Sequence, residues 1–447
     1  MNGTANPRTA YRARKFNSAI SALGWVISFI LGLGILPSLT ALSESFGEMA
    51  PFLFRLSGPI NPLKISIPLL MLYFWLRRRK ISGKLRWALT GIFLLGLATT
   101  IGASLGCGAI PGNGIREWAA MTIGMLCAAN LLVLEPRQRR VVVGSWAALI
   151  VLLAFLDKAF PAAIDWQYAH IFDPHTRWYD AQVASTRLLT GVFGFQSFAK
   201  LLSWVPWLAL AFLPWLNEKR RGFILWVVFT ALATGLILST TQRGPFLGML
   251  LGWVAYFAHA RLRVFKRDLL MPGVLAAALI AAVTFIATPR EIFQGRVEAA
   301  VLPSAEATRS AKDASNNINF RKIMWGISLE SVANHPLGDA CIPEQTFKER
   351  GVYNTHSHNL FLHQFRERGW LWGIVHLALW LFALISAWRN QTAHASALFA
   401  GLICIMAQGM FDHPWFVLNH SMILSLYLLA SIKLSVEENE ATPVEAS

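Results

Sequence analysis

Long uncharged stretches, separated by short charged segments, occupy most of the chain. A helix needs about 20 apolar residues to cross a bilayer core of ~30 Å, with a tolerated range of ~17–25. Eleven of the uncharged stretches hold between 16 and 29 residues, so the pattern predicts eleven membrane-spanning helices. These are Phe16–Ser43, Trp87–Ile115, Trp118–Leu134, Val141–Leu156, Leu201–Asn217, Gly222–Gln242, Gly244–Ala260, Leu269–Pro289, Gly369–Trp388, Asn390–Phe411 and His413–Ile432.

A twelfth span is expected between Pro59 and Leu76, although Lys64 shortens its uncharged part to 12 residues. The expected fold is therefore an all-α polytopic membrane protein with about twelve transmembrane helices. The predicted parts are a cytoplasmic N-terminus (1–17), helices one to nine (18–288), a large outer loop (289–368), helices ten to twelve (369–433) and a cytoplasmic tail (434–447).

Composition and charge support the membrane interpretation. Charged residues make up 14% of the chain, whereas a soluble globular protein carries about 25%. The formal net charge is +16, which on a soluble domain would raise nucleic acid as a partner. Here 22 of the 40 Lys and Arg residues fall in the segments that twelve spans place on the inner side. The positive-inside rule accounts for this bias, so no nucleic-acid partner is expected.

Two outer segments are long, one at 161–190 and one at 289–368. The second is charged but nearly balanced, with ten Lys or Arg and nine Asp or Glu residues. Its apolar positions predict an amphipathic helix over Phe320–Asn334, which His335-Pro336 ends. A loop of this length usually serves a function, and a purely structural cap is the alternative.

Cys107 and Cys341 both fall on the outer side of this topology. A disulfide between them is one option, and two separate thiols are the other.

Arg243 stands at the outer junction of two predicted spans, where almost no loop separates them. An arginine at the membrane rim is costly and is by default a functional hypothesis. A side chain that only reaches the headgroups is the alternative. Arg187 and Arg321 lie on the same side, and each taken alone favours a salt bridge or a surface role.

His356 and His358 immediately precede span ten, in a His-x-His pattern. Such a pair can bind a metal, with Asp339, Glu344 or Asp412 as further ligands, but their spacing selects no metal. A histidine can also accept a proton from a hydroxyl near neutral pH. The general base is the preferred interpretation, and a histidine that only caps the helix is the alternative.

Three stretches together resemble the O-antigen ligase and polymerase superfamily of bacterial inner membranes. They are Arg187–Ala199 (RLLTGVFGFQSFA), Ser239–Gly248 (STTQRGPFLG) and Arg321–Gly373. The third contains His335-Pro336-Leu337-Gly338, the His358-Asn359-x-x-Leu362 core and Glu367-x-Gly369-x-x-x-Gly373. The resemblance implies a fold similar to the GT-C glycosyltransferases, with 289–368 as a large periplasmic loop between spans nine and ten.

The resemblance also implies an activity. Such proteins transfer glycans from undecaprenyl pyrophosphate at the periplasmic face, and no metal or other cofactor is expected. Ligases use the lipid A–core oligosaccharide as acceptor, and polymerases join repeat units. Arginine binds phosphate oxygens through two donors, so Arg243, then Arg321 and Arg187, are expected to hold the pyrophosphate. His358 is the expected base, with His356 as a competing choice or an orienting partner.

The ligase is the preferred activity, because one long outer loop ends in the His-Asn motif. The polymerase and a transferase to protein hydroxyls are alternatives within the superfamily. A transporter or flippase for a polar lipid is an alternative from another class. Transporters often carry matching broken spans in their two halves, and the sequence shows no such pair.

Overall fold

The computed structural model describes residues 7–35, 63, 66–106, 112–159, 195–239, 243–260, 273, 276–281, 309–339, 344–350, 357–411 and 418–441. These residues are almost entirely helical, and they include no strand. The helices are α1 (Pro7–Leu33), α5 (Ile67–Arg77), the 3-10 turn η1 (Arg78–Lys80), α6 (Gly83–Gly106), α7 (Gly112–Val133), α8 (Pro136–Ala159), α11 (Phe195–Phe212), α12 (Pro214–Glu218), α13 (Arg220–Ser239), α14 (Arg243–Ala260), α17 (Arg309–Asn334), α18 (Glu344–Glu349), α19 (Leu360–Arg389), α20 (Ala393–Gly409) and α21 (Leu418–Ala441).

The all-α membrane class predicted from the sequence is confirmed. Among the described residues, four helices are long and apolar enough to cross a membrane, namely Lys15–Leu33, Gly83–Ala103, Arg220–Leu238 and Leu360–Arg389. Every other predicted span except 269–289 overlaps a described helix, and for the expected twelfth span between Pro59 and Leu76 this helix is the shorter α5. Within 269–289 only 273 and 276–281 are described. The total of twelve spans and the likeness to GT-C enzymes stay predictions.

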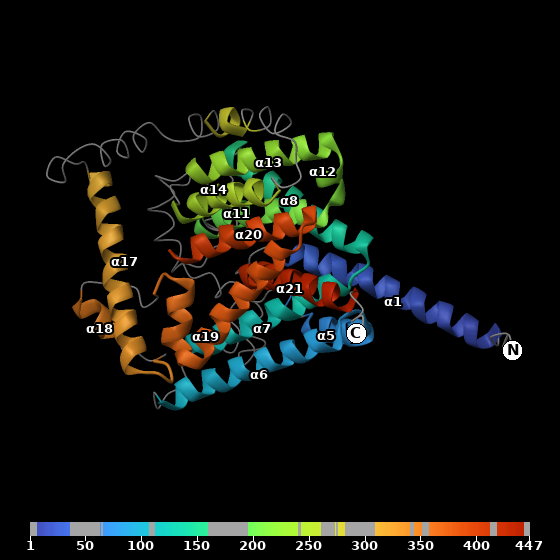
Figure 1. The fold of residues 1–447 in the computed structure, drawn as a ribbon, viewed down its shortest axis with the longest axis horizontal. Helices are drawn as coiled ribbons and strands as arrows, with labels where there is room; N and C mark the ends of the chain where they lie inside the picture. The colour runs from blue at the N-terminus through green and yellow to red at the C-terminus, as the bar shows by residue number, and fades with distance from the viewer. Residues whose placement is uncertain are drawn as a thin grey trace, which may run out of the picture.

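The long helices pack side by side into a bundle (Figure 1). Helix α20 lies against α11, α14 and α19, and α21 lies against α7 and α19. Helix α17 packs on α19 and crosses one end of the bundle, at the left of Figure 1. It ends at Asn334 as predicted but begins at Arg309, before the predicted start at Phe320. The outer segment thus contributes a long helix that covers the end of the bundle.

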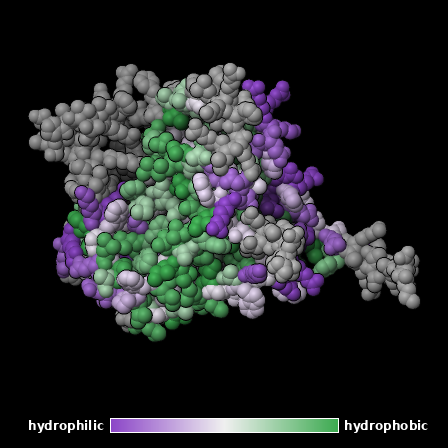
Figure 2. All heavy atoms as spheres, viewed as in Figure 1, coloured by the Kyte–Doolittle hydropathy of each residue, from purple (hydrophilic) through white to green (hydrophobic). Residues whose placement is uncertain are grey.

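The second part of α19 carries a stripe of exposed apolar side chains. Tryptophan occupies both ends of this stripe, at Trp370 and Trp388. The eighteen helical rises between them, at 1.5 Å each, give about 27 Å, close to the thickness of a hydrocarbon core. Tryptophan is typical of both membrane interfaces. Figure 2 shows an apolar band with hydrophilic residues on either side of it, as a membrane-embedded surface requires. Between the two tryptophans the stripe consists of Leu371, Ile374, Leu381, Phe382 and Ile385.

Candidate functional site

Helix α19 is broken at Gly369, which has φ 81° and ψ 177°. Only glycine adopts this backbone conformation without strain. The sequence predicted that span ten begins at this glycine. The structure instead starts the helix at Leu360, so residues 360–368 form a separate helical segment before the membrane-crossing part.

The Pro336–Asp339 turn, which follows α17, forms backbone hydrogen bonds on both sides of this break. The Trp370 amide donates to the Pro336 carbonyl at 2.9 Å, and the Asp339 amide donates to the Arg366 carbonyl at 2.6 Å. The backbone of the turn is in direct contact with the backbone at Gly369, because a Cβ on Gly369 would lie 2.5 Å from the carbonyl carbon of Leu337. The Pro-Leu-Gly and Glu-x-Gly motifs, separate in the sequence, therefore form one contact.

The turn before α19 holds His358. Its φ is 44°, in the left-handed region, and its side chain is partly buried. On one side, the Ser357 hydroxyl accepts a hydrogen bond from Ser328 of α17 at 2.9 Å. On the other, the Asn359 side chain accepts from the amides of Phe361 and Leu362, both at 3.0 Å, and so caps α19.

Three candidate segments meet at the end of α20. The Asn359 side-chain amide donates to the Met410 carbonyl at 3.3 Å, which places the His358 turn there. Trp325 of α17, one helical turn from Arg321, has its ring centroid 6.3 Å from that of Phe411. A Cβ on Gly244, the second residue of α14, would lie 3.9 Å from Cβ of Phe411. The backbone of Arg243, the turn of His358 and the helix of Arg321 are thus neighbours.

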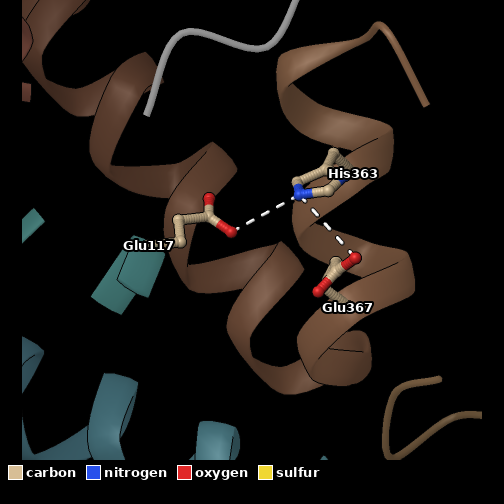
Figure 3. Close-up of side chains that lie close together, drawn as sticks. All are labelled: Glu117, His363 and Glu367. Carbon is tan, nitrogen blue, oxygen red and sulfur yellow. Dashed lines mark ion pairs between the residues drawn. The ribbon is translucent and has the colours of Figure 1, made fainter. Parts of the chain in front are cut away.

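The 360–368 segment also takes part in a buried polar network, of which Figure 3 shows Glu117, His363 and Glu367. Glu117 of α7 accepts a hydrogen bond from the Gln364 side chain. Its Oε2 also lies 3.4 Å from Nε2 of His363 and 3.8 Å from a guanidinium nitrogen of Arg368. The side-chain oxygen Oε1 of Gln364 accepts a hydrogen bond from Trp372 Nε1 at 2.6 Å.

Glu367 completes the network. Its Oε1 lies 2.5 Å from a guanidinium nitrogen of Arg366 and 3.9 Å from His363 Nε2. One ligand atom each from Glu117, His363 and Glu367 falls within 4.8 Å of the others, a spacing that could hold a metal ion. Both carboxylates, however, already lie beside a guanidinium, so the charges balance when His363 is neutral. A divalent cation would add two uncompensated charges to a buried cluster, which is strongly unfavourable.

Residues 226–377 match the protein family described as O-antigen ligase. No curated protein matches the chain. The match supports the O-antigen ligase and polymerase superfamily that the sequence motifs suggested.

The matched region 226–377 contains four of the five predicted site residues. Of these, His358 is fully described and Arg321 lies partly buried on α17. Arg243 is the first residue of α14, and its side chain lies outside the described residues. His356 lies outside them altogether, as does Arg187, which precedes the matched region.

The predicted disulfide option also lies outside the described residues, since neither Cys107 nor Cys341 is among them. Cys127 and Cys404 are buried free thiols, which agrees with their place in spans. The long outer segment 161–190 is not described either.

Sequence reasoning missed Glu117, which lies before the matched region 226–377. In the sequence its charge only separates two predicted apolar runs, beside Arg116. Two weak signals existed. A carboxylate next to a span is costly unless it has a partner, and His363 and Glu367 stand four residues apart on one helix face. Neither signal indicates that α7 and α19 meet at these residues.

Proposed function

We propose that the protein is an O-antigen ligase. It would transfer O-antigen polysaccharide from undecaprenyl pyrophosphate to the lipid A–core oligosaccharide, at the periplasmic face of the bacterial inner membrane. The observation that carries the proposal is the family match over 226–377. The meeting of the Arg243 backbone, the Arg321 helix and the His358 turn at the end of α20 adds support.

The proposed chemistry is a single inverting displacement. An acceptor hydroxyl oxygen attacks the anomeric carbon of the donor sugar from the side opposite the pyrophosphate. His358 takes the hydroxyl proton as the new C–O bond forms, which suits a group that titrates near neutral pH. The bond to the pyrophosphate oxygen breaks, and undecaprenyl pyrophosphate leaves with the electron pair.

Arginine is suited to the leaving group. A guanidinium stays charged and binds two phosphate oxygens at once, and in a low-dielectric groove such donors stabilise developing negative charge. In this proposal Arg243 contributes most, followed by Arg321 and Arg187. The arginines take the part that a divalent metal plays elsewhere, so the transfer needs neither a metal nor another cofactor.

The acceptor distinguishes the ligase from its relatives. An O-antigen polymerase would add the glycan to a second lipid-linked glycan, and a protein O-oligosaccharyltransferase would add it to a protein hydroxyl. The purified protein is incubated with lipid-linked glycan donor and each acceptor in turn. We expect product with lipid A–core, in the presence and absence of EDTA. Product only with the lipid-linked acceptor would identify a polymerase instead.

The same assay separates an enzyme from a lipid transporter or flippase. A carrier needs a sealed membrane and makes no new glycosidic bond. Formation of glycan product in detergent solution is therefore the expected result. Failure of every acceptor to yield product under these conditions would remove the proposal.

A further inference from the structure

The segment before the break in α19 is held by polar contacts to an extent unusual beside a membrane. Four of its nine residues are buried and charged or titratable: His363, Arg366, Glu367 and Arg368. Burying such groups is tolerated only where each has a partner of opposite charge or a hydrogen bond. The orientation of the segment is thus set by specific pairs.

Glu117 connects this segment to the rest of the bundle. It is fully buried on α7 and contacts His363, Gln364 and Arg368, which lie on successive turns of the segment. Through Gln364 the contact continues to Trp372, which lies beyond the break at Gly369. One carboxylate therefore ties both sides of the break to a single neighbouring helix.

The turn that contains His358 is attached to the start of the 360–368 segment. The His363 amide donates to the Asn359 carbonyl at 3.0 Å, and Asn359 caps the same helix end. His358 precedes this cap directly. A shift or rotation of the segment consequently moves the proposed base, and a displacement of about 1 Å can cost roughly 100-fold in rate.

We propose that Glu117 is a positioning residue, which holds the 360–368 segment in register and thereby aims His358 at its substrate. This inference rests on the proposed function. Glu117 is fully buried, so it acts through the segment and does not touch the substrate.

The test compares Glu117→Gln with a matched control, Glu135→Gln, in the full-length purified protein. Glu135 also pairs with an arginine, Arg77, at 3.2 Å, but it follows the other end of α7. Gln at 117 keeps the shape and loses the charge. We expect kcat to fall roughly 10- to 100-fold, with KM for the donor within about threefold of the original value. The control should keep both constants. An unchanged kcat for Glu117→Gln would overturn the proposal.

A double variant identifies the route of the effect. If Glu117 acts through His358, then Glu117→Gln combined with His358→Ala is no slower than His358→Ala alone. If the rate loss of the double variant equals the product of the two single losses, Glu117 acts independently of His358, and the proposal is overturned. Should Glu117→Gln fail to fold, Glu117→Gln with Arg368→Gln restores the charge balance and replaces it in the same assays.

Hydrogen exchange gives a measurement that needs no activity. Glu117→Gln should make the amides of residues 360–368 exchange about tenfold faster or more, and the control should leave them unchanged. Unaltered exchange would overturn the positioning role. A wild-type protein that transfers no glycan would instead defeat the proposed function, so the two failures are distinguishable.

Discussion

Single residues in this protein carry charge in surroundings that are otherwise apolar. Glu117, Arg366 and Arg368 are buried, and each lies beside a group of opposite charge. A carboxylate or guanidinium without such a partner would be destabilising by several kcal/mol in this environment, on the order of 3–5 when one partner is removed. Beside the end of α20, by contrast, His358 is only partly buried, which is compatible with its proposed role as the base.

Replacing His358 by Ala should lower the transfer rate by ~100- to 10,000-fold, because the acceptor proton then has no positioned base. The rate is measured with purified protein, lipid-linked donor and acceptor. His394→Gln is the control, since His394 contacts the Ala211 carbonyl at the opposite end of α20. A near-normal rate for His358→Ala would mean that His358 is not the base, and that either His356 acts as the base or neither histidine does.

Arg243→Lys should lower the rate by roughly 100- to 1,000-fold, even though the charge is kept. Lysine lacks the planar pair of donors that binds two phosphate oxygens. The same transfer assay measures the loss, and the folded fraction is checked by size-exclusion chromatography. Normal turnover by the lysine variant would show that a point charge is sufficient at this position.

At the scale of the element, α19 is two helices joined at a break. The part after Gly369 has the length and exposed apolar stripe of a membrane span, whereas the part before it is short and polar. The Pro336–Asp339 turn supplies the hydrogen bonds that the break would otherwise leave unmade. The break therefore couples the outer helix α17 to the membrane-crossing part of α19.

Gly369→Ala should destabilise the protein by about 1–3 kcal/mol, because alanine is strained at positive φ. The added Cβ would also lie 2.5 Å from Leu337 backbone. Thermal unfolding in detergent measures the change. Gly326→Ala is the control, since a Cβ there has no neighbour within 4 Å on exposed helix α17. That control should be neutral or stabilising by up to roughly 1 kcal/mol. Equal stability of Gly369→Ala and the original protein would contradict the strain.

At the scale of the whole molecule, the bundle has two chemically different ends. The outer end gathers α17, the His358 turn and the start of α14. The end that is predicted to face the cytoplasm carries basic residues such as Arg77, the last residue of α5, and Arg78 and Arg79 after it. The positive-inside rule predicts that the basic end faces the cytoplasm, so the proposed reaction would take place on the opposite side.

Single cysteines at the two ends should label from opposite sides of the membrane. Leu337 and Arg79 are both exposed, and Cys107→Ser with Cys341→Ser removes the thiols expected on the outer side. In spheroplasts, a membrane-impermeant maleimide should label Leu337→Cys, whereas Arg79→Cys should react only after the membrane is disrupted. The reverse pattern would invert the predicted topology.

The sequence alone predicted the all-α membrane class and the positions of most of the described helices, whereas the orientation in the membrane stays a prediction. Hydrophobic length and charge bias act locally along the chain, so Gly244–Ala260 was predicted to within one residue of α14. The contact between Pro-Leu-Gly and Gly369 and the network around Glu117 were decided only by the tertiary structure. Glu117 and His363 lie 246 residues apart, 363 minus 117, and no local pattern records which helices become neighbours. Their pairing follows from the positions of α7 and α19 in one bundle, which bring the buried Glu117 carboxylate within reach of His363 and Arg368 on another helix.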